Sequence, residues 1–163
     1  MSPRAAWRLE TLGFEQVHDY VGGKADWLAN GLAREGAAAT VPYAGDVVDR
    51  SPPTCGLTTP IAEVRTALDD SGYGFCLVVN EHRIVLGRVH RSAIQDADDS
   101  ATAESAMEPG PSTVRFNVPA ADLVRRLAER HLQTAIVTTP AGALVGVFHR
   151  TNAERQLHPP AAL

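Results

Sequence analysis

The chain has 163 residues, of which 44% are hydrophobic and 21% are charged, and its formal net charge at pH 7 is -4. This composition is typical of a globular chain and excludes both intrinsic disorder and a broad basic surface, so we expect no nucleic-acid partner. The chain opens with no charged-then-apolar leader and has no apolar stretch of the ~20 residues that cross a bilayer, so we expect a cytoplasmic protein without a membrane partner.

The first 36 residues predict a small unit of helix, strand and helix. Residues 2–13 read as a helix that ends at glycine, residues 14–20 as a strand, and residues 25–32 as a second helix. This unit has more apolar surface than it can cover alone, so we expect it to pack on the rest of the chain as a cap, on a second copy, or on a missing partner domain. Its large apolar residues are Trp7, Leu9, Leu12, Phe14, Tyr20, Trp27 and Leu28.

An internal repeat fills most of the remaining chain. The segment from Gly87 to Ser92 returns 59 positions later, from Gly146 to Thr151. Ungapped self-similarity indicates two copies of one supersecondary unit. The same offset superposes four more pairs: Pro60 and Pro119, Leu68 and Leu127, Val78 and Val137, and Thr54 and Thr113.

The first copy spans residues 41–97 and predicts strand, helix, strand, strand and helix in this order. An extended piece begins at Thr54, a helix starts at Pro60, and residues 75–79 and 84–89 form two strands joined by a turn. The helix has an apolar stripe of Ile61, Val64 and Leu68.

Five acidic residues lie between the copies, in a stretch without basic residues. The simplest interpretation is a solvated loop. The alternative, a loosely held divalent cation, is disfavoured because the spaced ligands and central glycine of a calcium loop are missing. The five residues are Asp96, Asp98, Asp99, Glu104 and Glu108.

The second copy spans residues 103–157 and repeats the same order. A helix starts at Pro119, residues 135–148 form a hairpin, and a final helix starts near Thr151, whose hydroxyl can cap it. The predicted fold class is therefore α/β (α+β). The apolar stripe of the first helix consists of Leu123, Val124, Leu127 and Ala128.

This pattern resembles the tandem cystathionine-β-synthase-type (CBS) domain, two copies of which make a Bateman module. The resemblance covers residues 41–157 and rests on Thr-Val before a proline-initiated helix and on a hairpin ending in Leu-Val-Gly-Val-x-x-Arg. It implies two α/β units around a pseudo-twofold axis, with AMP, ATP or a related adenosine ligand in the cleft between them. It also implies a homodimer through the helical faces, for which we expect the two apolar stripes to supply surface.

The chain departs from the family at the ligand positions. Relatives that bind adenosine ligands end the last strand with Gly-h-h-Thr-x-x-Asp, where the threonine meets phosphate and the aspartate takes both ribose hydroxyls. The threonine positions hold His90 and His149, and the aspartate positions hold Ala93 and Asn152. Losing a charged partner costs about 1.5–3 kcal/mol. We therefore expect any nucleotide to bind weakly, and in the second copy, where Asn152 keeps an acceptor.

The His-Arg pair that starts the last helix of each copy has two interpretations. Free backbone N–H groups and a guanidinium there would attract an anion, or the pair is partly solvated at a strand end. No metal site is expected, because third and fourth ligands are missing. The candidate residues for a nucleotide or another anion are Thr113, Val114, His149, Arg150 and Asn152, with Thr54, His90 and Arg91 in the first copy.

The leading segment has a second resemblance, to the C-terminal part of a rhodanese (thiosulfate sulfurtransferase) domain, over residues 1–36. Leu-Gly-Phe, then Val-Gly-Gly, then Trp27 and Gly31-Leu32 are similar to that family. Rhodanese chemistry needs a cysteine in the loop before the first helix, but no cysteine precedes Cys55. The resemblance therefore implies a remnant without its nucleophile.

Three functions follow from these observations. The leading hypothesis is a non-catalytic regulatory or interaction module, a degenerate CBS pair with an unidentified protein partner. The second is an adenosine-nucleotide sensor. The third is a sulfurtransferase that uses Cys55 or Cys76, which is disfavoured because neither cysteine lies in a glycine-rich or cationic loop of the required kind.

Overall fold

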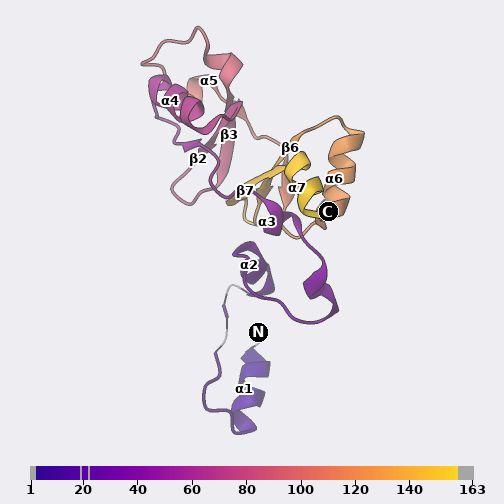
Figure 1. The fold of residues 1–163 in the computed structure, drawn as a ribbon. Coiled ribbons are helices and arrows are strands. Elements are labelled where there is room, and N and C mark those ends of the chain that lie inside the picture. The colour runs from indigo at the N-terminus through magenta and orange to yellow at the C-terminus, as the bar shows by residue number, and fades with distance from the viewer. Residues whose placement is uncertain (1–2, 19, 22, 158–163) are drawn as a thin grey trace.

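Each copy of the repeat forms its own sheet, and the two sheets lie side by side (Figure 1). The structure is a computed structural model that describes residues 3–18, 20–21 and 23–157. The mixed α/β class predicted from the sequence is confirmed. The first sheet has the order β1-β2-β3-β4 and the second the order β5-β6-β7.

The first copy is a parallel crossover followed by a hairpin. β1 (Thr54–Cys55) pairs in parallel with β2 (Phe75–Val79), and α4 (Ile61–Ser71) connects them. β2 pairs antiparallel with β3 (Val85–His90). The apolar stripe of α4 lies in the core with residues of the two central strands, and this core contains Ile61, Val64, Leu68, Cys76, Val78, Val89, Ile94 and Ala103.

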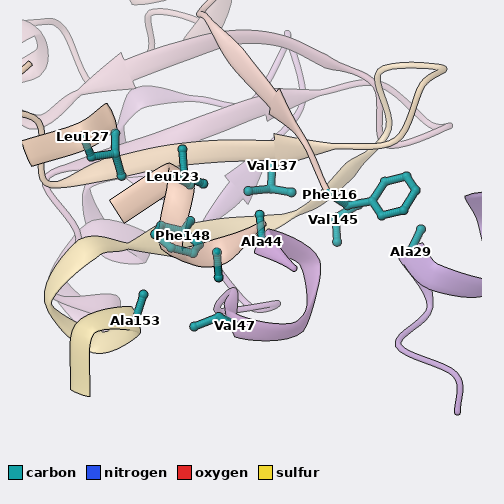
Figure 2. Close-up of a cluster of buried hydrophobic side chains, with 11 residues drawn as sticks. Ala29, Ala44, Val47, Phe116, Leu123, Leu127, Val137, Val145, Phe148 and Ala153 are labelled. Atoms are coloured by element: carbon teal, nitrogen blue, oxygen red, sulfur yellow. The ribbon is translucent and has the colours of Figure 1, made fainter. Parts of the chain in front are cut away.

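The second copy repeats this arrangement. β5 (Thr113–Arg115), α6 (Ala120–Glu129), β6 (Thr134–Thr138) and β7 (Leu144–His149) follow in order, and α7 (Arg150–Leu157) closes the unit. Figure 2 shows its core, in which side chains of α6, β6, β7 and α7 meet. The labelled residues of these four elements are Leu123, Leu127, Val137, Val145, Phe148 and Ala153.

Three details of the two copies differ from the sequence prediction. The first copy ends in a short 3₁₀ helix, η2 (Arg91–Ile94), in place of a full helix. In the second copy, α7 begins at Arg150, so Thr151 lies inside the helix and is not its cap. The stripe residues Val64, Leu68, Leu123 and Leu127 are buried within their own copies and therefore supply no surface for a dimer.

The segments that lead into the two copies are exchanged between them. α3 (Ala44–Val47) precedes the first copy but packs against β7, α6 and α7 of the second. α5 (Ala103–Ala106), which occupies the equivalent position 59 residues later, packs against β3 of the first copy. Ala44 N–H donates to the Val118 carbonyl at 2.7 Å, and Ala103 N–H donates to the Thr59 carbonyl at 2.8 Å. Each core is therefore closed by a piece of the other copy.

After these short helices, each exchanged segment pairs with the last strand of the copy it enters. Asp49 forms an antiparallel bridge with Val147 on β7, while β4 (Glu108–Pro109) pairs with β3. Two equivalent glycines make room for this approach. A Cβ at Gly146 would overlap the Asp49 carbonyl oxygen, and a Cβ at Gly87 would overlap the Met107 side chain.

The two hairpins meet at the pseudo-twofold axis. Ile84 and Ala143, which occupy equivalent positions, form an antiparallel bridge. On either side of it, Val85 N–H donates to Gly142 at 3.2 Å and Leu144 N–H donates to Arg83 at 2.8 Å. A third apolar cluster between the sheets joins the copies and contains Phe75, Leu77, Ile136, Leu144 and Val147.

The N-terminal segment only partly covers the pair. α2 (Gly23–Ala29) contributes Ala29 to the core of the second copy, and Arg50 donates to the Ala29 carbonyl at 3.0 Å. α1 (Pro3–Thr11) has no buried residue and is set apart from the sheets in Figure 1. The predicted strand over 14–20 is wrong, because the described residues of that stretch form none. No helix within the described residues is long and apolar enough to span a membrane.

Gly146→Ala should destabilise the fold more than Gly87→Ala. The first substitution meets backbone, which cannot move without breaking the bridge to Val147, so we expect the free energy of unfolding to fall by about 2–3 kcal/mol. The second meets the flexible end of Met107, so we expect a loss of about 1 kcal/mol. Urea denaturation would measure both.

Gly74→Ala is the matched control, because nothing lies within 4 Å of its added Cβ. Equal losses of stability in Gly87→Ala and Gly146→Ala would contradict the expectation that the Asp49 backbone cannot move away from the added Cβ.

Candidate functional site

His149, at the end of β7, lies in a small polar cluster built from both copies. The Tyr73 hydroxyl donates to Asp49 Oδ2 at 2.6 Å and lies 2.9 Å from His149 Nε2. The Tyr73 and His149 rings also meet edge to face, with centroids 5.3 Å apart. With its proton directed at Asp49, the Tyr73 oxygen is free to accept a hydrogen bond from His149 Nε2–H.

The exchange of lead segments builds this cluster. Tyr73 follows α4 in the first copy, Asp49 lies on the exchanged segment, and His149 ends a strand of the second copy. The hydrogen bond from Tyr73 and the backbone N–H of Ser51 lower the pKa of Asp49. Burial and the Asp49 carboxylate raise the pKa of Tyr73. The cluster therefore places a negative charge beside His149 at neutral pH.

His90, the equivalent residue of the first copy, meets a different group. Its Nε2 lies 3.3 Å from Glu108 Oε2, and Arg88 donates to the same oxygen at 2.7 Å. The hydrogen bond and charge of Arg88 lower the pKa of Glu108. Asp49 and Glu108 occupy equivalent positions, so each histidine lies near a carboxylate from an exchanged segment.

The structure keeps His149, Arg150 and Asn152 together but separates Thr113 and Val114 from them. Thr113 and Val114 lie on β5 and pair with β6, whereas His149 lies on β7 at the other side of β6. Two strand spacings, about 10 Å, therefore separate Thr113 from His149. Thr54 similarly pairs with Leu77 inside the first sheet.

Several donors of the two His-Arg pairs are engaged within the chain, which favours the interpretation without a bound anion. The backbone N–H of Arg150 donates to the Gln133 carbonyl at 2.9 Å, and its guanidinium contacts the Gln133 side chain at 3.3 Å and Glu154 at 3.8 Å. In the first copy, the Arg91 N–H donates to Gly74 and its guanidinium pairs with Asp69. Asn152 is exposed on α7.

Sequence reasoning missed Asp49, Tyr73 and the ion pair of Arg88 with Glu108. The available signal was the offset of 59, which aligns Asp49 with Glu108. The acidic residues between the copies are exposed, as the solvated interpretation predicts. They are not all loop residues, because Glu108 lies on β4, and the Asp99 carboxylate pairs with Arg65. No cluster of metal ligands exists among the described residues.

The two cysteines are neighbours in the first core. Cys76 is fully buried, and the hydrogen bond to Cys55 together with burial raises the pKa of its thiol. A buried thiol with a raised pKa provides no thiolate at neutral pH. This environment gives no support to sulfur transfer by Cys76.

Comparisons with known proteins show which proteins have the same fold. Residues 44–100 match the family model of the CBS domain. The CBS domains of a transcriptional regulator from Streptococcus pneumoniae align with a TM-score of 0.62 and 17% identity, over 69% of this chain and 97% of that one. No curated protein matches the chain.

Two further solved structures contain adenosine ligands. A CBS domain pair in complex with 5′-methylthioadenosine and S-adenosyl-L-methionine aligns with a TM-score of 0.58 and 18% identity, over 72% of this chain and 96% of that one. CBSX2 in complex with AMP aligns with a TM-score of 0.60 and 19% identity, over 71% and 96%. The fold is that of a CBS domain pair. The rhodanese resemblance of residues 1–36 stays a prediction.

The Asp49 contact should stabilise the fold at neutral pH and lose its effect in acid. Because folding lowers the pKa of Asp49, its contribution is complete above the ordinary value of 3.8 and is lost as pH falls through the lower folded value. We therefore expect the difference in free energy of unfolding between the native chain and Asp49→Asn to be constant from pH 7 to about 5 and to vanish in stronger acid.

Urea denaturation at a series of pH values would measure this difference. Tyr73→Phe removes the main donor to Asp49 and should move the loss of stability to higher pH. A difference that does not change with pH would contradict the role given to the carboxylate.

Proposed function

We propose that the chain is a non-catalytic regulatory or interaction module whose second-copy cleft is occupied by its own side chains. One observation carries this proposal: Tyr73 and Asp49 engage His149, which stands where the resemblance implies a phosphate-binding threonine. A phosphate entering there would meet the Asp49 carboxylate and would have to break a hydrogen bond of 2.6 Å.

The ribose side of the cleft supports the same proposal. Ala93 accepts no hydrogen bond, and Asn152 offers a neutral oxygen in place of a carboxylate. In the first copy, Glu108 lies beside His90 and is paired with Arg88. Both clefts therefore lack the group that favours a ribose, and in each a carboxylate of the chain lies beside the histidine.

The alternative is an adenosine-nucleotide sensor. Fold neighbours were solved with AMP and with S-adenosyl-L-methionine, and Asn152 is exposed at the start of α7. On this alternative AMP, ATP or a related ligand displaces Asp49 and uses Asn152. Sulfur transfer is not proposed, because neither thiol has the cationic, accessible setting of a reactive cysteine.

A thermal shift assay with AMP, ATP and S-adenosylmethionine separates the two functions. We expect no change in the unfolding midpoint of the native chain, whereas a ligand at 100 times its dissociation constant would add about 2.7 kcal/mol. The double variant Asp49→Asn, Asn152→Asp removes the opposing charge and restores the ribose acceptor. It should gain on the order of tenfold in affinity, because a charged hydrogen bond contributes about 1.5–3 kcal/mol.

Ala93→Asp is the matched control in the first copy and should gain nothing, because Glu108 remains beside His90. If one of these ligands raises the unfolding midpoint of the native chain, and this effect disappears in Asn152→Ala, the chain is an adenosine-nucleotide sensor instead.

We also propose that the chain associates as a homodimer through its N-terminal segment. Trp7, Leu12 and Phe14 keep 64%, 60% and 59% of their surface exposed, and α1 buries none of its residues against the rest of the chain. A second copy offers the same apolar surface in return, as a twofold contact requires.

Sedimentation velocity at tens of micromolar should show a species of twice 17.4 kDa. The double variant Trp7→Ser, Phe14→Ser should sediment as a monomer, while Val41→Ser, which changes an exposed apolar residue outside α1, should not. A native chain that sediments only as a monomer would contradict this proposal.

A further inference from the structure

A pocket of about 170 Å³ lies in the second copy, apart from His149 and its partners. Side chains of α6 and of Arg130 directly after it form one wall, and the first residues of β5 and β6 form the other. Two arginines, Arg126 and Arg130, line it together with the hydroxyl residues Ser112 and Thr113, and Leu127 is among its apolar residues. Among the residues that the structure describes, no carboxylate lines this pocket.

The two arginines have no carboxylate partner there. Arg126 lies in the last turn of α6 and Arg130 is its C-cap residue, four positions later, so the two like charges are close together. Within the described part of the chain, neither guanidinium makes an ion pair or a hydrogen bond. By contrast, the neighbouring Arg125 donates to Asp122 at 3.0 Å.

The internal repeat provides a comparison within the same molecule. Ala67 and Ser71 occupy the positions in the first copy that correspond to Arg126 and Arg130. The arginines near α4, Arg65 and Arg91, are neutralised by Asp99 and Asp69. The paired positive charge is therefore a property of the second copy and not a requirement of the fold.

We propose that this pocket binds a small phosphate monoester. Such an ester has a charge of about -1.5 to -2 at pH 7, which matches two guanidinium groups, and guanidinium binds phosphate oxygens through paired hydrogen bonds. The hydroxyls of Ser112 and Thr113 supply further donors, and Leu127 faces the carbon part of the ester. This proposal does not depend on the function proposed above, which concerns His149 and Asn152.

The volume limits the size of the ligand. A pocket of 170 Å³ holds about five or six waters, and drug-sized ligands occupy pockets above ~300 Å³. A phosphate with a few carbons therefore fits, and a whole nucleotide does not.

Backbone amide NMR on the full chain would test this proposal, with glycerol 3-phosphate, inorganic phosphate and acetate as probes. We expect glycerol 3-phosphate to shift the amides of residues 112–114 and 130–135 and to bind more tightly than inorganic phosphate, with no saturable effect of acetate. Arg126→Gln and Arg130→Gln should each weaken binding about tenfold, the equivalent of 1.4 kcal/mol. Arg125→Gln, the matched control, should change the affinity less than twofold.

The proposal would be overturned by the absence of a saturable shift at these amides, by equal weakening in Arg125→Gln, or by equal binding of acetate. Amide shifts at the pocket that depend on protein concentration without any probe would also overturn it, because the occupant would then be a second copy. Shifts confined to residues 149–152 would indicate the cleft of the sensor alternative and would likewise overturn it.

Discussion

The exchange of the lead segments is the interaction on which the rest of the structure depends. Ala44 and Val47 complete the core of the second copy, and Ala103 completes that of the first. Because each copy lends the other part of its core, neither can close its apolar interior alone. The glycines of the two last strands are the local requirement for this arrangement, since any side chain there would meet the incoming segment.

The same exchange gives the two clefts different chemistry. It delivers a carboxylate to each histidine, but the neighbouring residues are not equivalent. In the first copy, Arg88 neutralises Glu108, whereas the residue that corresponds to Arg88 in the second copy is Val147. Asp49 is stabilised there by the Tyr73 hydroxyl instead. An ion pair on one side and a hydrogen bond from a neutral hydroxyl to a carboxylate on the other make the two copies asymmetric despite their shared backbone.

The repeat allowed the two units, their strands and their crossover helices to be predicted, because each of these elements is specified by local periodicity and by proline at the helix start. The exchange could not be predicted. α3 and α5 have four residues each, too few to show an amphipathic pattern, and Tyr73 and His149 are 76 positions apart. Of the predicted site residues, His149 lies in a polar cluster, whereas β6 separates Thr113 from it. This separation was not predicted, because the sequence does not show which strand lies between two others. The strand expected over residues 14–20 was wrong for a related reason. A strand needs a neighbouring strand that pairs with its backbone N–H and C=O groups, and a local sequence pattern does not show whether one is present.

Arg50 connects these parts of the molecule. It follows Asp49 directly, and its guanidinium donates to the carbonyls of Ala29 on α2 and Gly45 on α3 at 3.0 and 2.9 Å. The cleft at His149 and the attachment of α2 are therefore adjacent along the backbone, although they lie on different elements. Because Arg50 directly follows Asp49, a displacement of Asp49 would also move Arg50. Through the hydrogen bond from Arg50 to Ala29, that movement would reach α2, the helix that joins the N-terminal segment to the CBS pair.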